Sequence, residues 1–192
     1  MRLLVVMLAA FAVLVPSTAY ADSLGVSDAT GDVWATPSGG TATPAPGVTK
    51  GDITRMVVRN NRTTLVVVVH FVDLARTGRY AGYDVWLQAH NTLVRREFVL
   101  EAGPGDWSGR VRVFSPNGTL RHCPTTHTID YATNLVRLTA RRSCLGTPSL
   151  VRAGLNVYRA TRSSGQTTLY SDNPFDTNAE SAAWTSWVRR TQ

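Results

Sequence analysis

Aspartates are concentrated in a few short polar turns of this sequence, and their chemistry is considered first. Asp28 and Asp32 flank Gly31 in the stretch DATGDVW, and Asp52 follows a glycine further along. Near the other end, the stretch YSDNPFDTN contains Asp172. Carboxylate and carbonyl oxygens are the ligands of Ca²⁺, which takes about six to eight of them. Because chain termini often lie close together in a single domain, these four aspartates are candidate calcium ligands.

Ordinary turn chemistry is the simpler explanation of the same residues. Aspartate side chains accept hydrogen bonds from nearby backbone N–H groups in Asx turns, and Gly31 would permit a tight reversal of the chain. The spacing is not that of an EF-hand loop. Turn formation and calcium binding therefore both remain open for Asp28 and Asp32.

Aromatic residues offer a second kind of chemistry. Tyr83, Trp86 and Trp107 fall in or beside predicted loops and strand ends. Sugar-binding sandwiches use such rings as stacking platforms, with polar neighbours that hold the hydroxyls. These three residues are candidate carbohydrate ligands, and core packing is the alternative role for each ring.

The two cysteines, Cys123 and Cys144, predict one disulfide, because an even pair in an exported chain pairs readily. Such a bond is expected to stabilise the fold by about 3 kcal/mol. Metal ligation is the alternative, since His122 and His127 lie close by. Their spacing matches no compact zinc template.

The sequence contains no recognisable catalytic motif. Residues 105–109, GDWSG, are one residue too long for a nucleophile elbow, and no histidine belongs to an H-E-x-x-H motif. Glu97 and Glu101 share one strand face with each other only. We therefore expect no catalytic activity. The alternative is a small secreted hydrolase with carboxylates or histidines assembled across strands.

Residues 1–21 have the pattern of a secretory signal peptide. Arg2 precedes an apolar run that is short for a membrane span, and a small-x-small motif ends at Ala21. We expect cleavage before Asp22, which would leave residues 22–192 as one secreted domain without a membrane span.

The formal charge is +7 at pH 7, and nearly all basic residues are arginine. The arginines are scattered and often alternate with apolar residues, as in RVRVF. This alternation is typical of solvated strand faces rather than of a nucleic-acid-binding stripe, so we expect no nucleic-acid partner. Weak binding to anionic cell-wall polymers is compatible with the charge.

From residue 52 the chain is a series of short strand-like runs. Polar residues 60–63 predict a hairpin turn. The run 65–72 is apolar at nearly every position, which indicates a central strand covered on both faces. Asn117-Gly118 indicates another hairpin. Strands recur without any long helical period, so we expect an all-β fold, an antiparallel, jelly-roll-like β-sandwich.

Two further segments frame the expected sandwich. Residues 36–51 are rich in proline and glycine and predict a long, flexible N-terminal loop. In the tail, the spacing of Trp184, Trp187 and Val188 fits one face of a helix, and a closing strand is the alternative.

Taken together, the motifs resemble those of a family of secreted β-sandwich proteins from high-GC Gram-positive bacteria. The shared features are a D-x-x-G-D opening, a G-D-I strand start and the segment SCLGTPSLVR. More loosely, the opening is similar to that of DOMON-like and family 9 carbohydrate-binding modules. This resemblance implies a sandwich with a calcium or ligand site near Asp28, Gly31, Asp32 and Asp52. The paired tryptophans of the family 9 modules have no counterpart here.

These observations lead to one functional expectation. We expect a secreted, monomeric, non-catalytic binding or surface-associated module, with extracellular or cell-wall polysaccharide as its partner and calcium as a structural ion. A cell-envelope protein that binds anionic polymers through its arginines is the alternative from another class, beside the hydrolase.

Overall fold

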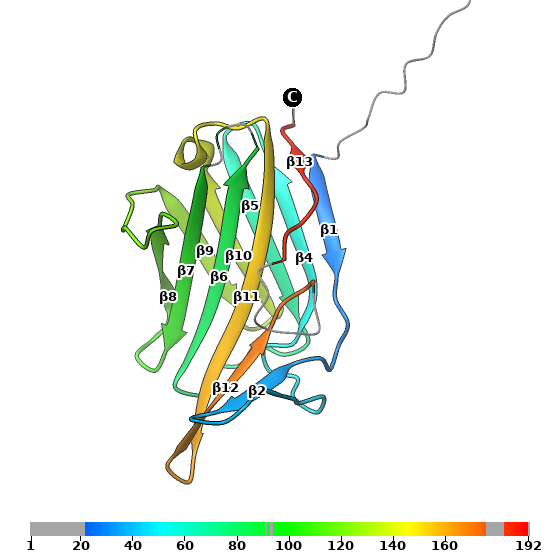
Figure 1. Cartoon of the computed structure of the whole chain (residues 1–192), viewed down its shortest axis with the longest axis vertical. Helices are drawn as coiled ribbons and strands as arrows, with labels where there is room; N and C mark the ends of the chain where they lie inside the picture. The colour runs from blue at the N-terminus through cyan, green and yellow to red at the C-terminus, as the bar shows by residue number, and fades with distance from the viewer. Residues whose placement is uncertain (1–21, 91, 93, 176–182, 192) are drawn as a thin grey trace, which may run out of the picture.

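The structure is a computed structural model, and it describes residues 22–90, 92, 94–175 and 183–191. The predicted signal peptide, with its cleavage position at Ala21, lies outside the described residues, and Asp22 is their exposed first residue. Two antiparallel sheets pack face to face, with the larger sheet toward the viewer in Figure 1. The predicted all-β sandwich is therefore confirmed.

The smaller sheet has five strands, and its central strand is the apolar run of the sequence. Its order is β1 (Ser23–Ser27), β4 (Ile53–Asn60), β5 (Thr64–Phe71), β10 (Leu135–Arg141) and β9 (Thr125–Asp130). The hairpin predicted at residues 60–63 joins β4 to β5, and the Asn61 N–H donates to the Thr64 carbonyl at 2.9 Å. The predicted central position of this apolar run is confirmed.

The larger sheet has eight strands. Seven follow the order β3 (Thr43–Pro44), β2 (Trp34–Pro37), β12 (Gln166–Asp172), β11 (Leu150–Ser163), β6 (Tyr80–Ala89), β7 (Arg95–Gly103) and β8 (Asp106–Phe114). The eighth, β13 (Val188–Arg189), pairs with β11. The predicted loop 36–51 thus contains β3 and the end of β2, which extend this sheet.

The core lies between the sheets and is built from alternate residues of each strand. On β5, Leu65, Val67 and Val69 point inward and are 1% exposed. Val66 and Val68 point to the opposite face, and they are only 6% and 4% exposed because larger side chains on the neighbouring strands shield them. This double burial explains why the run lacks the alternation of an ordinary antiparallel strand.

One disulfide joins Cys123 to Cys144, as predicted. Cys144 lies in a short 3₁₀-helix, η1 (Arg142–Leu145), which ends at Gly146 in the left-handed conformation. The bond connects the segment before β9 to the segment after β10. Because both cysteines are in the disulfide, the alternative of zinc ligation by Cys123 does not hold.

The tail forms a strand and not a helix. Val188 is fully buried and pairs with Val151 of β11, and the Thr185 N–H donates to the Ala153 carbonyl at 2.8 Å. Tertiary pairing therefore decides between the two alternatives that the spacing of the tail residues had left open.

The first and last segments of the described part of the chain meet at Asn60, a fully buried residue. Its N–H donates to the Asp22 carbonyl at 3.2 Å, and its own carbonyl accepts the Thr191 N–H at 2.9 Å. Its side-chain amide donates to the Val188 carbonyl at 3.2 Å. Figure 1 shows β1 and β13 side by side at this corner.

The hairpin predicted at Asn117-Gly118 is only partly formed. Residues 115–119 make the turn, and the chain returns along β8 through a single bridge between Phe114 and Leu120. The Arg121 N–H then donates to the Val113 carbonyl at 2.7 Å.

Candidate metal centre

The turn after β1 places two of the predicted ligands on one short reversal of the chain. Gly31 has a φ of 83°, and a Cβ there would lie 3.2 Å from the carbonyl oxygen of Pro46. The Asp28 N–H donates to the Thr54 carbonyl at 3.0 Å, which anchors the turn to β4. Glycine is required because a side chain would be strained in backbone and crowded in space. The tight turn at Gly31 lets the carboxylates of Asp28 and Asp32 approach each other.

Asp52 supports this turn from the start of β4. Its Oδ2 accepts the Gly31 N–H at 2.9 Å, and the residue is 1% exposed. Its Oδ1 is buried without a hydrogen-bond partner among the described residues. Leaving a buried acceptor without a partner costs about 1–3 kcal/mol, and more for a charged group. A nearby cation would remove this cost.

Asp172 reaches the same region from the far end of the sequence. It is the last residue of β12 and is 2% exposed. Its Oδ2 accepts the Ile53 N–H at 2.7 Å. The C-terminal end of β12 is thereby held against the beginning of β4.

Three of the four predicted ligands share one centre. One carboxylate oxygen from each of Asp28, Asp32 and Asp172 lies within 4.8 Å of the other two. Asp52 lies beside this group and holds the turn. Two oxygens on opposite sides of a Ca²⁺ ion, each about 2.4 Å from it, are about 4.8 Å apart. Carboxylate oxygens within this distance of one another are close enough to bind one calcium ion together.

The turn explanation and the calcium explanation apply to different oxygens of the same residues. The Oδ1 of Asp28 accepts the Ala29 N–H at 3.0 Å, as turn chemistry predicts. The Oδ2 of Asp28 and the Oδ1 of Asp32 are buried without hydrogen-bond partners in the described part of the chain. Turn formation thus leaves carboxylate oxygens that can bind a metal ion.

Burial and mutual repulsion disfavour the charged forms of these carboxylates. Burial, together with the smaller effects of the charges of Asp32 and Asp52, raises the pKa of Asp28 to about 7. Burial likewise raises the pKa of Asp172 to about 8, although the Ile53 N–H opposes this shift. Such a cluster gains stability from bound protons or from a bound cation.

The donor set also narrows the identity of the cation. All three clustered ligands are carboxylates, which suit hard cations such as Ca²⁺ and Mg²⁺ rather than Zn²⁺. Mg²⁺ requires oxygens at about 2.0–2.1 Å in a near-ideal octahedron, so opposite ligands would have to lie about 4 Å apart. Oxygens that lie within 4.8 Å of one another can surround either ion, and calcium, with its more flexible coordination, is the ion taken forward.

The three aromatic residues predicted to bind carbohydrate lie in different places. Tyr83 is 2% exposed and packs edge to face against Phe71 in the core, with ring centres 5.9 Å apart. Its ring cannot stack on a ligand, because the β6 alternation turns it inward. Trp107 packs edge to face against Tyr131, whose hydroxyl donates to the Trp107 carbonyl at 2.9 Å.

Trp86 lies on the outer face of the larger sheet and takes part in a stack of rings and cations. The guanidinium carbon of Arg95 is 6.0 Å from the centre of the Trp86 ring and 5.0 Å from that of Trp184. The guanidinium carbon of Arg152 is 4.9 Å from the ring centres of both Trp184 and Trp187. Each such contact contributes about 0.5–1 kcal/mol. This stack fastens the tail to β11, a role that the sequence alone did not indicate.

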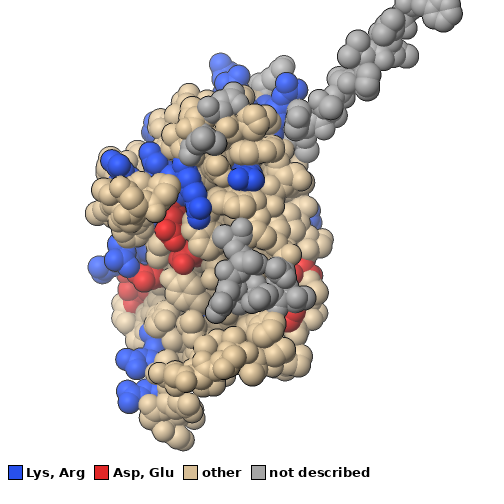
Figure 2. Space-filling model, viewed as in Figure 1, with Lys and Arg blue, Asp and Glu red and all other residues tan. Residues whose placement is uncertain are grey.

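The same outer face carries acidic groups, which lie between basic ones in Figure 2. Burial raises the pKa of Asp84 to about 6, and the nearby charge of Glu97 adds to this shift. The Tyr158 hydroxyl donates to Asp84 at 3.2 Å. Asp84 and Glu97 lie on the neighbouring strands β6 and β7, and no geometry here assigns these or other carboxylates the reaction that the hydrolase alternative would need.

Four arginines gather on the outer face of the smaller sheet. Arg55, Arg59, Arg137 and Arg141 are all exposed and occupy outward positions on β4 and β10. The ion pairs found in the described part of the chain are made by Arg110 and Arg112 instead. Scattered in the sequence, these arginines are brought together by strand alternation and register.

Register explains how this arginine face is assembled. Arg59 pairs across to Val66 of β5, which pairs in turn with Thr139 of β10. Two residues further along β5, Val68 pairs with Arg137 of β10. The two arginines on β4 are four residues apart, and so are the two on β10. The Cα atoms within each pair therefore lie about 13 Å from each other.

Comparison with protein-family models, with curated proteins and with solved structures finds no match to this chain. No helix in the described residues is long and apolar enough to cross a membrane. The fold and the acidic cluster therefore define the class on their own: a disulfide-linked antiparallel β-sandwich with a candidate divalent-metal centre between its first turn and the end of β12.

Proposed function

We propose that this chain is an exported, non-catalytic binding module whose sandwich is stabilised by a calcium ion at Asp28, Asp32 and Asp172. The observation that carries this proposal is the shared centre of these three carboxylates beside Asp52, a 1%-exposed carboxylate with an unpartnered oxygen. The disulfide supports export, because such bonds persist in oxidising compartments.

The ion would link parts of the chain that are distant in the sequence. Asp28 and Asp32 belong to the first turn, and Asp172 ends β12. A divalent cation would offset the repulsion among the carboxylates and replace the protons that the metal-free cluster retains near neutral pH. The turn, β4 and β12 would then be held together.

Thermal unfolding of the mature protein, with calcium and with chelator, tests this proposal. At a calcium concentration of about 100 times Kd, a single site adds about 2.7 kcal/mol. For a domain of this size, that corresponds to an increase in Tm of roughly 5–10 °C. Asp32→Asn should abolish the increase, whereas the control Asp106→Asn, at an exposed ion pair elsewhere, should retain it. An unchanged Tm at millimolar calcium would overturn the proposal.

A second candidate function, binding of an anionic polysaccharide, is favoured by the arginine face defined above. Four exposed arginines without acidic partners, spaced about 13 Å apart along each strand, suit a polymer with regularly repeated charges better than a compact ligand. Val66 and Val68 between these arginines are buried, whereas the arginines themselves are exposed and accessible to a polymer.

Dextran sulfate and uncharged dextran of equal length test this second function. Binding is expected only to the sulfated polymer, and it should weaken as salt rises, because screening shortens the range of the arginine charges. The triple variant Arg55→Gln, Arg59→Gln, Arg137→Gln should lose most of the binding. Equal loss in a control that replaces Arg110, Arg112 and Arg162 would mean that net charge, and not this face, is responsible.

A further inference from the structure

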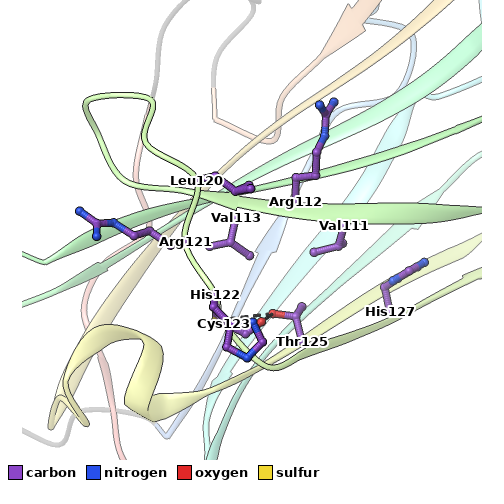
Figure 3. A pocket seen from close by; sticks show the side chains of 9 residues that line it. All are labelled: Val111, Arg112, Val113, Leu120, Arg121, His122, Cys123, Thr125 and His127. Atoms are coloured by element: carbon purple, nitrogen blue, oxygen red, sulfur yellow. Dashed lines mark hydrogen bonds between the residues drawn. The ribbon is translucent and has the colours of Figure 1, made fainter.

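A groove lies where the two sheets part, between the outer edges of β8 and β9. It has a volume of about 500 Å³, within the range of ligand sites in proteins. Figure 3 shows its lining side chains: Val111, Arg112, Val113, Leu120, Arg121, His122, Cys123, Thr125 and His127. None of these nine residues is acidic. The groove is far in the fold from the acidic cluster, which involves β4 and β12.

Fixed contacts close both ends of the groove. At one end, the Nε2 of His127 donates to the carbonyls of Ser108 and Gly109, at 3.0 and 3.1 Å. At the other end, the Arg121 N–H donates to the Val113 carbonyl at 2.7 Å. The disulfide of Cys123 holds the segment that carries Arg121 and His122. These hydrogen bonds and the disulfide therefore hold the walls of the groove in place and fix its length.

The backbone of β8 leaves one hydrogen-bonding position open between these ends. The carbonyls of Gly109 and Val113 both point away from β7, since they accept hydrogen bonds from His127 and Arg121. In an antiparallel strand, the N–H and C=O of alternate residues point to the same side. Val111 therefore presents its N–H and C=O toward the groove, and no described residue is hydrogen-bonded to them on that side.

The walls combine apolar surface with positive charge. Leu120 is 62% exposed, an unusual position for a large apolar side chain, and Val113 below it is 4% exposed. Arg121 and His122 are exposed at the same end, and the Nε of Arg121 donates to the Ser115 hydroxyl at 3.3 Å. A ligand that suits these walls carries a negative group close to a small apolar one.

We propose that this groove binds the C-terminal end of a peptide. The last amide of the peptide pairs with the N–H and C=O of Val111 as a short added strand. The terminal carboxylate lies against Arg121 and His122, and a small apolar side chain packs on Leu120. Arg112 is already paired with Glu101, and the exposed Arg121 supplies the positive charge that favours an anion in this lining, which contains no acidic residue.

The length of the open edge selects a chain end over an internal segment. Val111 is the position where both groups are open, since the carbonyls of Gly109 and Val113 on either side already accept hydrogen bonds from His127 and Arg121. A strand that continued in both directions would have to displace the His127 or the Arg121 contact. A peptide that stops at Val111 needs neither displacement. An anion without an amide, such as a fatty acid, would leave the N–H and C=O of Val111 without hydrogen-bond partners.

Fluorescence anisotropy with labelled peptides tests this inference on the mature protein with calcium present. The probe is a pentapeptide that ends in Ala-Ala with a free carboxylate, and the matched control is the same peptide with a C-terminal amide. The free acid is expected to bind at least about tenfold more tightly, because a charge-assisted hydrogen bond contributes roughly 1.5–3 kcal/mol. Equal binding of acid and amide, or no binding at about 1 mM peptide, would overturn the proposal.

Two variants locate the site. Arg121→Gln is expected to weaken binding of the free acid roughly tenfold, whereas Arg62→Gln, an exposed arginine in the β4–β5 turn, should leave it unchanged. Leu120→Asp places a negative charge on a surface side chain and should abolish binding without loss of folding, which circular dichroism would verify. Unaltered binding in both groove variants would contradict the assignment, as would equally tight binding of decanoate. Because this groove and the acidic cluster are separate, loss of the calcium effect in Asp32→Asn does not predict loss of peptide binding.

Discussion

The carboxylate of Asp172 accepts the backbone N–H of Ile53, and this hydrogen bond joins residues 119 positions apart in the sequence. It places the end of β12 at the start of β4, where Asp52 already holds the first turn through Gly31. The candidate metal centre is therefore connected by hydrogen bonds to both sheets. Its occupancy should affect the stability of the whole domain.

Asp172→Asn separates the structural role of this side chain from its charge. Asparagine keeps an oxygen that can accept the Ile53 N–H, and it removes one of the repelling charges. We expect the metal-free variant to be at least as stable as the natural chain at pH 8, and the calcium-induced rise in Tm to disappear. Scanning calorimetry with calcium and with chelator measures both. A variant that still gained several degrees from calcium would exclude Asp172 as a ligand.

The metal-free protein should lose stability as the pH rises. Burial raises the pKa of Asp28 to about 7 and that of Asp172 to about 8, from the ordinary 3.8. Between about pH 4 and pH 8 the folded state therefore holds protons that the unfolded state has released, so the free energy of unfolding decreases with rising pH. Calcium would replace these protons and flatten the slope.

Urea unfolding at pH 5 and pH 8, with calcium and with chelator, measures this linkage. Asp84, whose pKa is raised to about 6, contributes a slope of the same sign that calcium does not remove. The difference between the pH slopes of the free energy of unfolding with calcium and with chelator therefore reports on the candidate metal centre alone. Identical slopes with and without calcium would argue against metal binding there.

Asn60→Ala should destabilise the protein through the two termini that this residue joins. The substitution removes the amide that donates to the carbonyls of Val188 and Ser149, at 3.2 and 3.3 Å, so a fully buried side chain loses two hydrogen bonds, although the Ser149 carbonyl keeps the Arg190 N–H at 2.8 Å. We expect a loss of about 2–3 kcal/mol in the free energy of unfolding. Asn117→Ala, in an exposed turn, is the matched control and should cost much less. Comparable effects of the two variants would contradict the role assigned to Asn60.

Gly82→Ala should disturb the outer face of the larger sheet. A Cβ on Gly82 would lie 2.2 Å from the ring of Tyr158, which covers this glycine on the neighbouring strand. The ring must move, and its hydrogen bond to Asp84 is expected to break. We expect a destabilisation of about 1–3 kcal/mol and a changed near-ultraviolet circular dichroism spectrum. Gly47→Ala, where no atom lies within 4 Å, should change neither quantity.

Several site residues could be predicted because their local chemistry is distinctive. The glycine-containing turns predicted Asp28, Asp32 and Asp52 as candidate ligands, and the polar stretch YSDNPFDTN near the other end predicted Asp172. The structure brings three of them to one centre and gives Asp52 a supporting position. The disulfide could be predicted because the sequence contains a single pair of cysteines behind a predicted signal peptide, a combination that favours a disulfide.

Other residues could not be interpreted from local pattern, because their roles depend on register and sheet order. Tyr83 and Trp86 lie three positions apart on β6, and alternation sends one into the core and the other to the surface. The arginines of β4 and β10 looked scattered until β5 was placed between them. The groove at Val111 exists only because β8 and β9 are both edge strands.

The sequence by itself determined the all-β class, the apolar central strand, the disulfide and the acidic residues of the candidate metal centre. These follow from local composition and from periodicity two, which the backbone imposes on any strand. Only the tertiary structure decided which strands are neighbours, and so which distant side chains meet. Asp172 reaches Asp28 and Asp32 because pairing across 119 residues positions it there, and no local pattern encodes that pairing.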